Sequence, residues 1–215
     1  MSALPVIAID GPAASGKGTI ARRIAAALGF AHLDTGTLYR VVGLAVLRKH
    51  GDPSNQDDAN AAVQSLDLSL LEDPALRAHS TSVAASKVAA ILSVREALLS
   101  FQRNFAAHPP GGKGAVLDGR DIGTVICPGA DVKLFVTAQP DVRAHRRFLE
   151  HRANGNLMTE AEVLADIQSR DARDSGRTVA PLKQATDAHL LDTTHLDIEA
   201  ATERALSIVR AALRT

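Results

Sequence analysis

Three residues near the start of the chain have the spacing of a phosphate-binding loop. Gly11, Gly16 and Lys17 match the pattern G-x-x-x-x-G-K. Glycines allow the backbone to curl so that successive N–H groups point at one anion, and the helix that follows adds the positive end of its dipole. Lys17 supplies a mobile positive charge for the phosphates. The residues predicted to form this loop are Gly11, Pro12, Ala13, Ala14, Ser15, Gly16, Lys17, Gly18 and Thr19.

The elements on either side of this loop agree with the interpretation. Residues 6–10 are an apolar run that predicts a strand, and a helical pattern with Ile20 and Ile24 on one stripe follows and stops at Gly29. The general pattern has Ser or Thr directly after the lysine to hold magnesium, but here Gly18 follows Lys17. Thr19, one place later, is therefore the predicted metal ligand from this loop.

Length, composition and charge restrict the class of protein. The 215 residues and 46% hydrophobic content suit one compact α/β domain. The formal net charge of +0 predicts no nucleic-acid partner. Cys127 is the only cysteine, which fits a reducing cytoplasm. We expect neither a signal peptide nor a membrane-spanning segment, because the sequence has neither a basic start followed by an apolar stretch nor a sufficiently long apolar run.

Polar residues follow two further short strands. Asp118 ends the apolar run 115–117, where an acid of the Walker B type would hold Mg²⁺, and Arg120 and Asp121 come next. Thr35 and Arg40 follow a predicted strand at residues 31–33, with Arg40 in the first turn of the next helix. Because parallel strands present ligand groups at their carboxyl ends, we expect these side chains to face the same cleft as the loop.

Two arginine-rich helices are expected between residues 141 and 177. The first runs over 141–151, a turn follows at Asn154-Gly155, and Thr159 with Glu162 forms a capping box for the second. We predict a mobile lid; the alternative is a pair of solvated faces with local ion pairs. The charged residues involved are Arg143, Arg146, Arg147, Arg170, Asp171, Arg173, Asp174 and Arg177.

The order of elements predicts an α/β fold, a five-stranded parallel sheet with helices on both faces. The remaining strands are expected at 132–137 and 189–192, and Asp197 caps a last helix. We predict a single domain over 1–215. Its core is expected at 1–51, 83–140 and 178–215, an insert at about 52–82, and the lid at about 141–177. Between the predicted strands at 31–33 and 115–117 we expect a strand-like piece at 66–71, a helix at 82–92, and a capping box at Ser93 and Glu96.

These residues suit phosphoryl transfer, which requires two anions in line and cations between them. Lys17 would serve the donor, Arg40 with Arg95 or Arg120 the acceptor, and the lid arginines the charge between them. Two alternatives stay open. A kinase for a different nucleotide or for a hydroxylated metabolite would use Asp34 or Asp121 as a base. A nucleotide-dependent switch would need a guanine-reading N-K-x-D segment, which the sequence does not contain.

Along nearly its whole length the chain resembles the bacterial-type cytidylate kinases. The resembling segments are IDGPAASGKGT, LDTGTLYR, VREALLSFQR, LDGRDIGTV, KLFVTA, VRAHRR and SRDARDSGRTVAPL. The resemblance implies a P-loop nucleoside monophosphate kinase that transfers the γ-phosphoryl group of ATP to CMP or dCMP. It further implies Mg²⁺ as cofactor, a cytoplasmic location and a monomer.

The resemblance also assigns roles to residues. It places Thr35 beside the acceptor nucleotide, Arg40 and Arg95 on the acceptor phosphate, and Ser86 on the cytosine ring. It places Asp174 and Arg177 on the sugar. The implied catalytic residues are Lys17, Arg120, Arg146 and Arg170; Arg120, Asp121 and Arg170 are also implied to bind substrate, and Thr19 and Asp118 to bind the metal. The insert departs from the family because residues 66–82 are shorter than in many members, which bears on acceptor selectivity.

Overall fold

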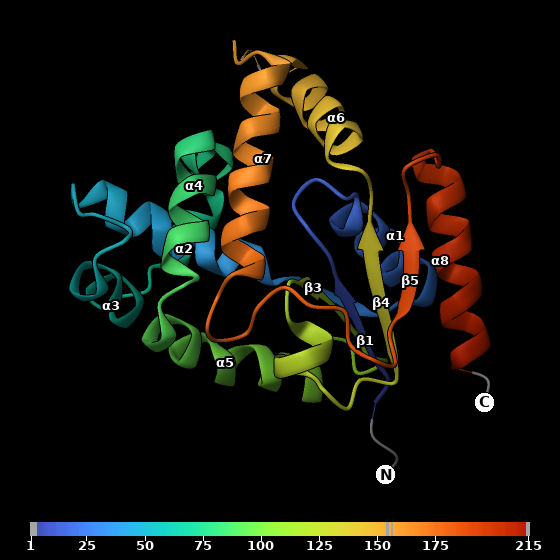
Figure 1. Ribbon diagram of the computed structural model, residues 1–215. Helices are drawn as coiled ribbons and strands as arrows, with labels where there is room; N and C mark the ends of the chain where they lie inside the picture. Colours follow the sequence, from blue (N-terminus) through green and yellow to red (C-terminus); the bar gives the residue numbers. More distant parts are fainter. Residues whose placement is uncertain (1–3, 154, 156, 214–215) are drawn as a thin grey trace. The chain divides into compact units, whose positions relative to one another are not determined.

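A five-stranded sheet organises the computed structural model, which describes residues 4–153, 155 and 157–213 (Figure 1). The strand order is β2-β3-β1-β4-β5, and the pairs β1–β3, β1–β4 and β4–β5 are parallel. The predicted α/β fold with a five-stranded parallel sheet is therefore confirmed. The strands are β1 (Val6–Asp10), β2 (Ala31–Asp34), β3 (Ala115–Gly119), β4 (Val132–Thr137) and β5 (His189–Asp192).

The chain divides into two compact units. The first contains residues 1–33 and 105–215, and the second contains residues 34–104. In the first unit, α1 (Lys17–Leu28) and α8 (Ile198–Ala212) pack on the sheet in one apolar cluster, with Ile7 and Ile9 of β1 at its centre. Strands β1 and β3 are almost wholly buried, as is typical of a parallel sheet covered by helices.

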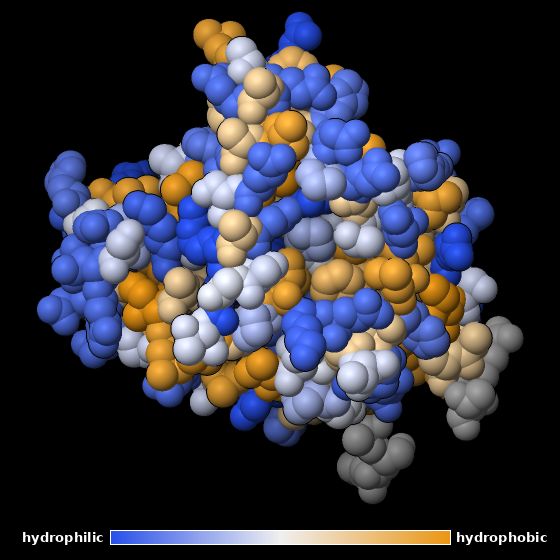
Figure 2. All heavy atoms as spheres, in the orientation of Figure 1, coloured by the Kyte–Doolittle hydropathy of each residue, from blue (hydrophilic) through white to orange (hydrophobic). Residues whose placement is uncertain are grey.

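Two antiparallel helices of the first unit, α6 (Pro140–Ala153) and α7 (Glu160–Ser175), form a hairpin (Figure 1). The predicted capping box is confirmed, since Thr159 and Glu162 exchange hydrogen bonds at the start of α7. Figure 2 shows hydrophilic and hydrophobic residues side by side over this part of the surface, and Leu149 and Leu157 are exposed. Arg177 lies beyond the end of α7, and the turn predicted at Asn154-Gly155 includes Asn154, which lies outside the described residues.

The second unit is helical. Its helices are α2 (Thr35–Arg48), α3 (Gln56–Gln64), α4 (His79–Val88) and most of α5 (Leu92–Ala107). A Cβ atom added at Gly43 of α2 would lie 2.8 Å from the Ala85 nitrogen of α4, so these two helices approach more closely than a larger residue permits. No helix among the described residues is long and apolar enough to span a membrane.

Four predictions for local structure in the second unit were wrong. Residues 66–71 do not form a strand. The chain instead makes two 3₁₀ turns, η1 (Leu68–Glu72) and η2 (Pro74–Arg77). Each turn is capped by an aspartate, Asp67 or Asp73, whose carboxylate accepts a hydrogen bond from a backbone N–H group two residues later. The helix expected at 82–92 is α4, which starts and ends earlier.

The capping box at Ser93 is also absent. Helix α5 already begins at Leu92, and the Ser93 hydroxyl bonds to the Asn60 side chain at 2.6 Å. Helix α2 likewise begins at Thr35, so Arg40 lies in its second turn rather than its first.

Candidate active site

The predicted phosphate-binding loop joins β1 to α1 and has the backbone shape that the motif requires. Gly11 has φ 154° and its missing side chain admits the Val136 carbonyl oxygen, which would lie 2.0 Å from a Cβ atom there. Ala14 and Gly16 have φ values of 58° and 86°. Positive φ values at such positions let backbone N–H groups turn into one concavity, which is suited to an anion. All nine predicted residues lie in this loop and the first turn of α1.

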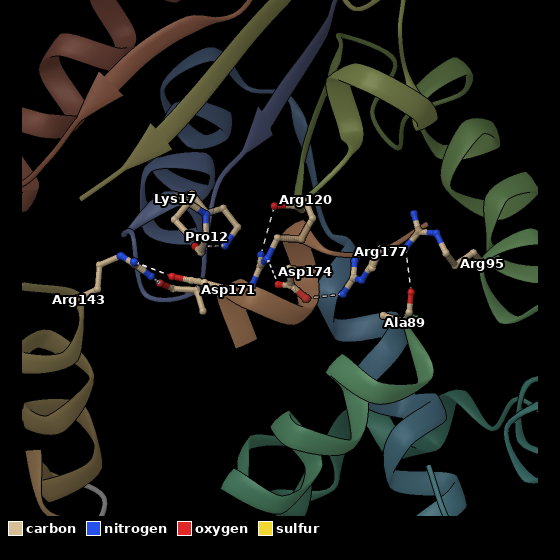
Figure 3. A network of polar contacts seen from close by, with 11 residues as sticks. Pro12, Lys17, Ala89, Arg95, Arg120, Arg143, Asp171, Asp174 and Arg177 are labelled. Carbon is tan, nitrogen blue, oxygen red and sulfur yellow. Dashed lines mark hydrogen bonds and ion pairs between the residues drawn. The ribbon is translucent and has the colours of Figure 1, made fainter. Parts of the chain in front are cut away.

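The side chains around this concavity fit a triphosphate with Mg²⁺. Lys17 Nζ donates to the Pro12 carbonyl oxygen at 3.2 Å (Figure 3). Asp118, the second-last residue of β3, is 3% exposed, and its Oδ2 atom would lie 3.6 Å from a Cβ atom at Gly18. This carboxylate therefore reaches the first turn of α1, the turn that also carries Thr19. Carboxylate and hydroxyl oxygens are ligands that Mg²⁺ prefers.

Both metal-ligand candidates have a side-chain partner within the first unit. His32 Nε2 lies 2.7 Å from Asp118 Oδ1, within hydrogen-bonding distance, and so orients the carboxylate from β2. Thr19 Oγ1 accepts a hydrogen bond from Arg22 Nη2 at 3.2 Å. His32 was not among the predicted site residues, and its place in the strand predicted at 31–33 gave no sign that its ring would reach Asp118.

Asp10, the last residue of β1, is a further member of the site that sequence reasoning missed. Its side chain is 5% exposed and accepts hydrogen bonds from the backbone N–H groups of Ile122 and Gly123, each at 2.7 Å. These two residues begin a π-helical turn, η3 (Ile122–Ile126), directly after Asp121. Asp10 thereby ties the segment that carries Arg120 and Asp121 to the strand that enters the phosphate-binding loop.

The titration of Asp10 should be measurable. Burial raises the pKa of Asp10 from 3.8 to about 6, although the bonds from Gly123 and Ile122 lower it. At a pH between the unfolded pKa of 3.8 and the folded pKa of about 6, the folded protein holds a proton on Asp10 that the unfolded chain has lost. This group therefore stabilises the fold at low pH, and its contribution disappears as the pH rises through about 6. The free energy of unfolding of wild type relative to Asp10→Asn should rise by roughly 1 kcal/mol between pH 6 and pH 5. Urea titrations of both proteins at these pH values test this; a constant difference would contradict it.

Asp174 joins three of the predicted arginines. It is 2% exposed near the end of α7 and accepts from Arg120 Nε at 2.8 Å and from Arg177 Nη2 at 2.5 Å (Figure 3). Burial alone would raise the pKa of Asp174, but Arg120 and Arg177 outweigh it, and with a contribution from Arg170 the pKa stays below its ordinary value. The structure therefore brings three predicted arginines, Arg120, Arg170 and Arg177, around the Asp174 carboxylate.

The arginines of α6 have different partners, and one of them contacts the phosphate-binding loop. Arg143 donates to the Ala13 carbonyl oxygen at 3.1 Å and to Asp171 at 2.7 Å. Arg146, a predicted catalytic residue, donates to Thr193 Oγ1 at 3.0 Å and to the Thr193 carbonyl oxygen at 2.7 Å. In the sequence these two arginines had looked equivalent to Arg147, which pairs with Glu150 instead; only their contacts in the folded protein separate them.

The remaining predicted residues lie in the second unit. Thr35 and Arg40 are on α2, Ser86 is on α4, and Arg95 is on α5. Arg95 is buried, donates to the Ala89 carbonyl oxygen at 3.3 Å, and its guanidinium carbon lies 5.7 Å from the centre of the Tyr39 ring. One apolar cluster joins α2, α4 and α5, so the second unit holds these elements as one body.

Within that unit, Arg40 donates to the Leu76 carbonyl oxygen at 3.5 Å, and Thr35 and Ser86 are buried polar residues. Gly43 sets the spacing of α2 and α4 that places Ser86, and it carried no recognisable signal in the sequence. Its role follows only from the close approach of the two helices.

Comparisons with known proteins agree with this geometry. The family model for cytidylate kinase matches residues 7–211. A cytidylate kinase of Nitrobacter winogradskyi is 59% identical over 204 residues, 95% of each chain, and one of Rhodopseudomonas palustris (strain BisB18) is 58% identical over 206 residues, 96% of each chain. A solved gluconokinase of Sinorhizobium meliloti 1021 superposes with a TM-score of 0.52 at 14% identity, over 100% of this chain and 97% of that one, which concerns the fold alone. The chain belongs to the cytidylate kinase family.

Proposed function

We propose that this protein transfers the γ-phosphoryl group of ATP to CMP or dCMP, giving ADP and CDP or dCDP. The observation that carries the proposal is the match to the cytidylate kinase family over residues 7–211, a span that includes both the phosphate-binding loop and the residues around Asp174. The reaction needs no strong general base, because an acceptor phosphate is already ionised near neutral pH.

On the donor side, the loop N–H groups and Lys17 would hold the β- and γ-phosphates of ATP. Asp118 and Thr19 would hold Mg²⁺, directly or through water, and the ion when bound would neutralise charge on these phosphates. Arg120 and Arg170 would stabilise the charge that develops during transfer. Their position around buried Asp174 supports this role, because it holds the guanidinium groups in place before substrate arrives.

On the acceptor side, Thr35, Arg40 and Arg95 would bind the nucleotide phosphate. Asp174 and Arg177 would contact its sugar, and Ser86 with Asp121 would read the cytosine. The support is positional similarity to the family together with the burial of Ser86, Arg95 and Asp121.

The helical hairpin α6–α7 is proposed as a lid that closes over both substrates, and Arg146 as a residue of that lid. Residues 1–215 are proposed to act as one kinase domain. The cytoplasmic location and the monomeric state that the family implies stay predictions.

A coupled assay of ADP release across nucleoside monophosphates tests the proposal. CMP and dCMP should give the highest kcat/KM, UMP and AMP lower values, and shikimate none above background. If AMP or shikimate is phosphorylated best, the acceptor assignment is wrong, while hydrolysis indifferent to every acceptor would indicate a switch protein.

Ser86→Ala should reduce the selectivity for CMP over UMP. Cytosine offers an N4 amino donor where uracil has an O4 acceptor, and Ser86 can accept from the former through its hydroxyl oxygen. A mismatch of buried polar groups costs roughly 1–3 kcal/mol, so removing the hydroxyl should lower the ratio of the two kcat/KM values by about tenfold.

The matched control is Ser93→Ala, which removes a hydroxyl bonded to Asn60 in the same unit and should leave the ratio unchanged. An unchanged ratio in Ser86→Ala, accompanied by a lower melting temperature, would show that Ser86 serves its own helix instead.

A further inference from the structure

We propose that Arg143 is a positioning residue that holds the phosphate-binding loop in its anion-binding shape and links that shape to helix α7. The proposal rests on the proposed function only in so far as the loop binds the phosphates of the donor nucleotide. Arg143 itself is assigned no contact with substrate.

The Arg143 side chain joins three parts of the first unit. It is 3% exposed, and its Nε donates to the Ala138 carbonyl oxygen at 2.8 Å, at the end of β4. Nη1 donates to the Ala13 carbonyl oxygen of the loop at 3.1 Å, and Nη2 donates to Asp171 Oδ2 of α7 at 2.7 Å (Figure 3). The rigid planar fork of arginine allows these three contacts at once, whereas the single ammonium group of lysine cannot reproduce their geometry.

The loop residues after Ala13 are held from the same side. Ala14 has φ 58° and packs on the apolar cluster of Ala144, Val163 and Ile167 in α6 and α7. The Ser15 carbonyl oxygen accepts from Thr193 Oγ1 at 3.2 Å. Three successive loop residues therefore have defined partners on their outer side, opposite to the N–H groups that face an anion.

This arrangement matters because the loop is costly to hold without support. A non-glycine residue with positive φ persists only where its surroundings impose that conformation, and Ala14 is such a residue. Arg143 fixes the carbonyl oxygen immediately before Ala14, so it limits the rotation by which the strain there would relax. The same side chain ends on Asp171, three residues before Asp174, so the position of α7 and the shape of the loop are connected through one guanidinium group.

The test measures ADP binding by isothermal titration calorimetry, without any acceptor. Arg143→Lys keeps the charge but loses the fork, and should raise the Kd for ADP about tenfold, as expected for the loss of a positioning hydrogen bond. Asp171→Asn, which weakens the hold on Arg143 from α7, should raise it by a smaller factor in the same direction. The Kd for CMP, measured alone, should stay within about twofold in both variants.

The control is His145→Gln, which removes a contact between α6 and exposed Glu160 but does not touch the loop. It should leave the Kd for ADP unchanged. The proposal is overturned if Arg143→Lys and Asp171→Asn both bind ADP like wild type, or if ADP and CMP binding weaken equally as the melting temperature falls. If Arg143→Lys does not fold, Asp171→Asn decides the question. Failure of the wild type to bind CMP would count against the proposed function, but the ADP measurement would still test Arg143.

Discussion

Replacing Lys17 with methionine is expected to abolish phosphoryl transfer and to leave the fold intact. The Lys17 ammonium group contacts the loop through the Pro12 carbonyl oxygen and lies where the β- and γ-phosphates of ATP would bind. Methionine keeps most of the length of the side chain but removes the positive charge that neutralises the transferring group. Loss of one such electrostatic contact should lower kcat by at least about a hundredfold.

The measurement is ADP release with CMP as acceptor, alongside circular dichroism of the variant. Lys113→Met, which alters an exposed lysine away from the loop, should behave as wild type in both. Normal turnover by a natively folded Lys17→Met protein would refute the assignment of the phosphate-binding loop.

Asp174→Asn should cause the largest loss of stability among single changes at the site. The Asp174 carboxylate is buried between Arg120 and Arg177, and asparagine has the same shape without the charge. Two mostly buried guanidinium groups would then lack the carboxylate that compensates them. Breaking a buried ion pair in this way costs about 3–5 kcal/mol in the free energy of unfolding. The KM for CMP should rise as well, because Arg120 would no longer be held in place.

Urea unfolding of both proteins measures this loss, and pH gives an independent check. The pKa of Asp174 lies below its ordinary value, so its stabilising contribution is present above the unfolded pKa and lost as pH falls through the folded pKa. The difference between wild type and variant should therefore shrink from pH 7 to the acid range below the ordinary aspartate pKa. Glu150→Gln, which breaks the exposed pair with Arg147, should change stability by less than about 1 kcal/mol. A loss of that small size in Asp174→Asn would mean that the buried network does not stabilise the fold.

The donor half of the site was predictable from the sequence because its signals are local. Strand, glycine-rich loop and helix follow one another around Lys17, and Asp118 lies near the carboxyl end of an apolar strand that pairs with β1. The predicted resemblance to cytidylate kinases is confirmed by the family match. These features depend on neighbours in sequence or on the general geometry of parallel sheets.

The features that were missed depend on contacts between distant segments. Asp10 looked like the end of a strand, and its function as an acceptor appears only when residues 122 and 123 reach it from more than a hundred positions away. Arg143 looked like one of several lid arginines, because spacing along a helix does not reveal which arginine meets a loop carbonyl. The wrong strand at 66–71 has a different cause: its leucines suggested a strand, but Asp67 and Asp73 capped 3₁₀ turns.

Efforts to alter base selectivity by directed evolution should leave Gly43 unchanged. A side chain there would collide with the backbone of α4 at Ala84 and Ala85, the two residues directly before Ser86. The helix would have to shift by some tenths of an ångström or more, and a shift of that size displaces the serine hydroxyl from any base that it reads. Libraries that vary side chains on α4 while conserving this glycine therefore sample recognition chemistry, whereas libraries that vary position 43 sample mainly misplaced helices.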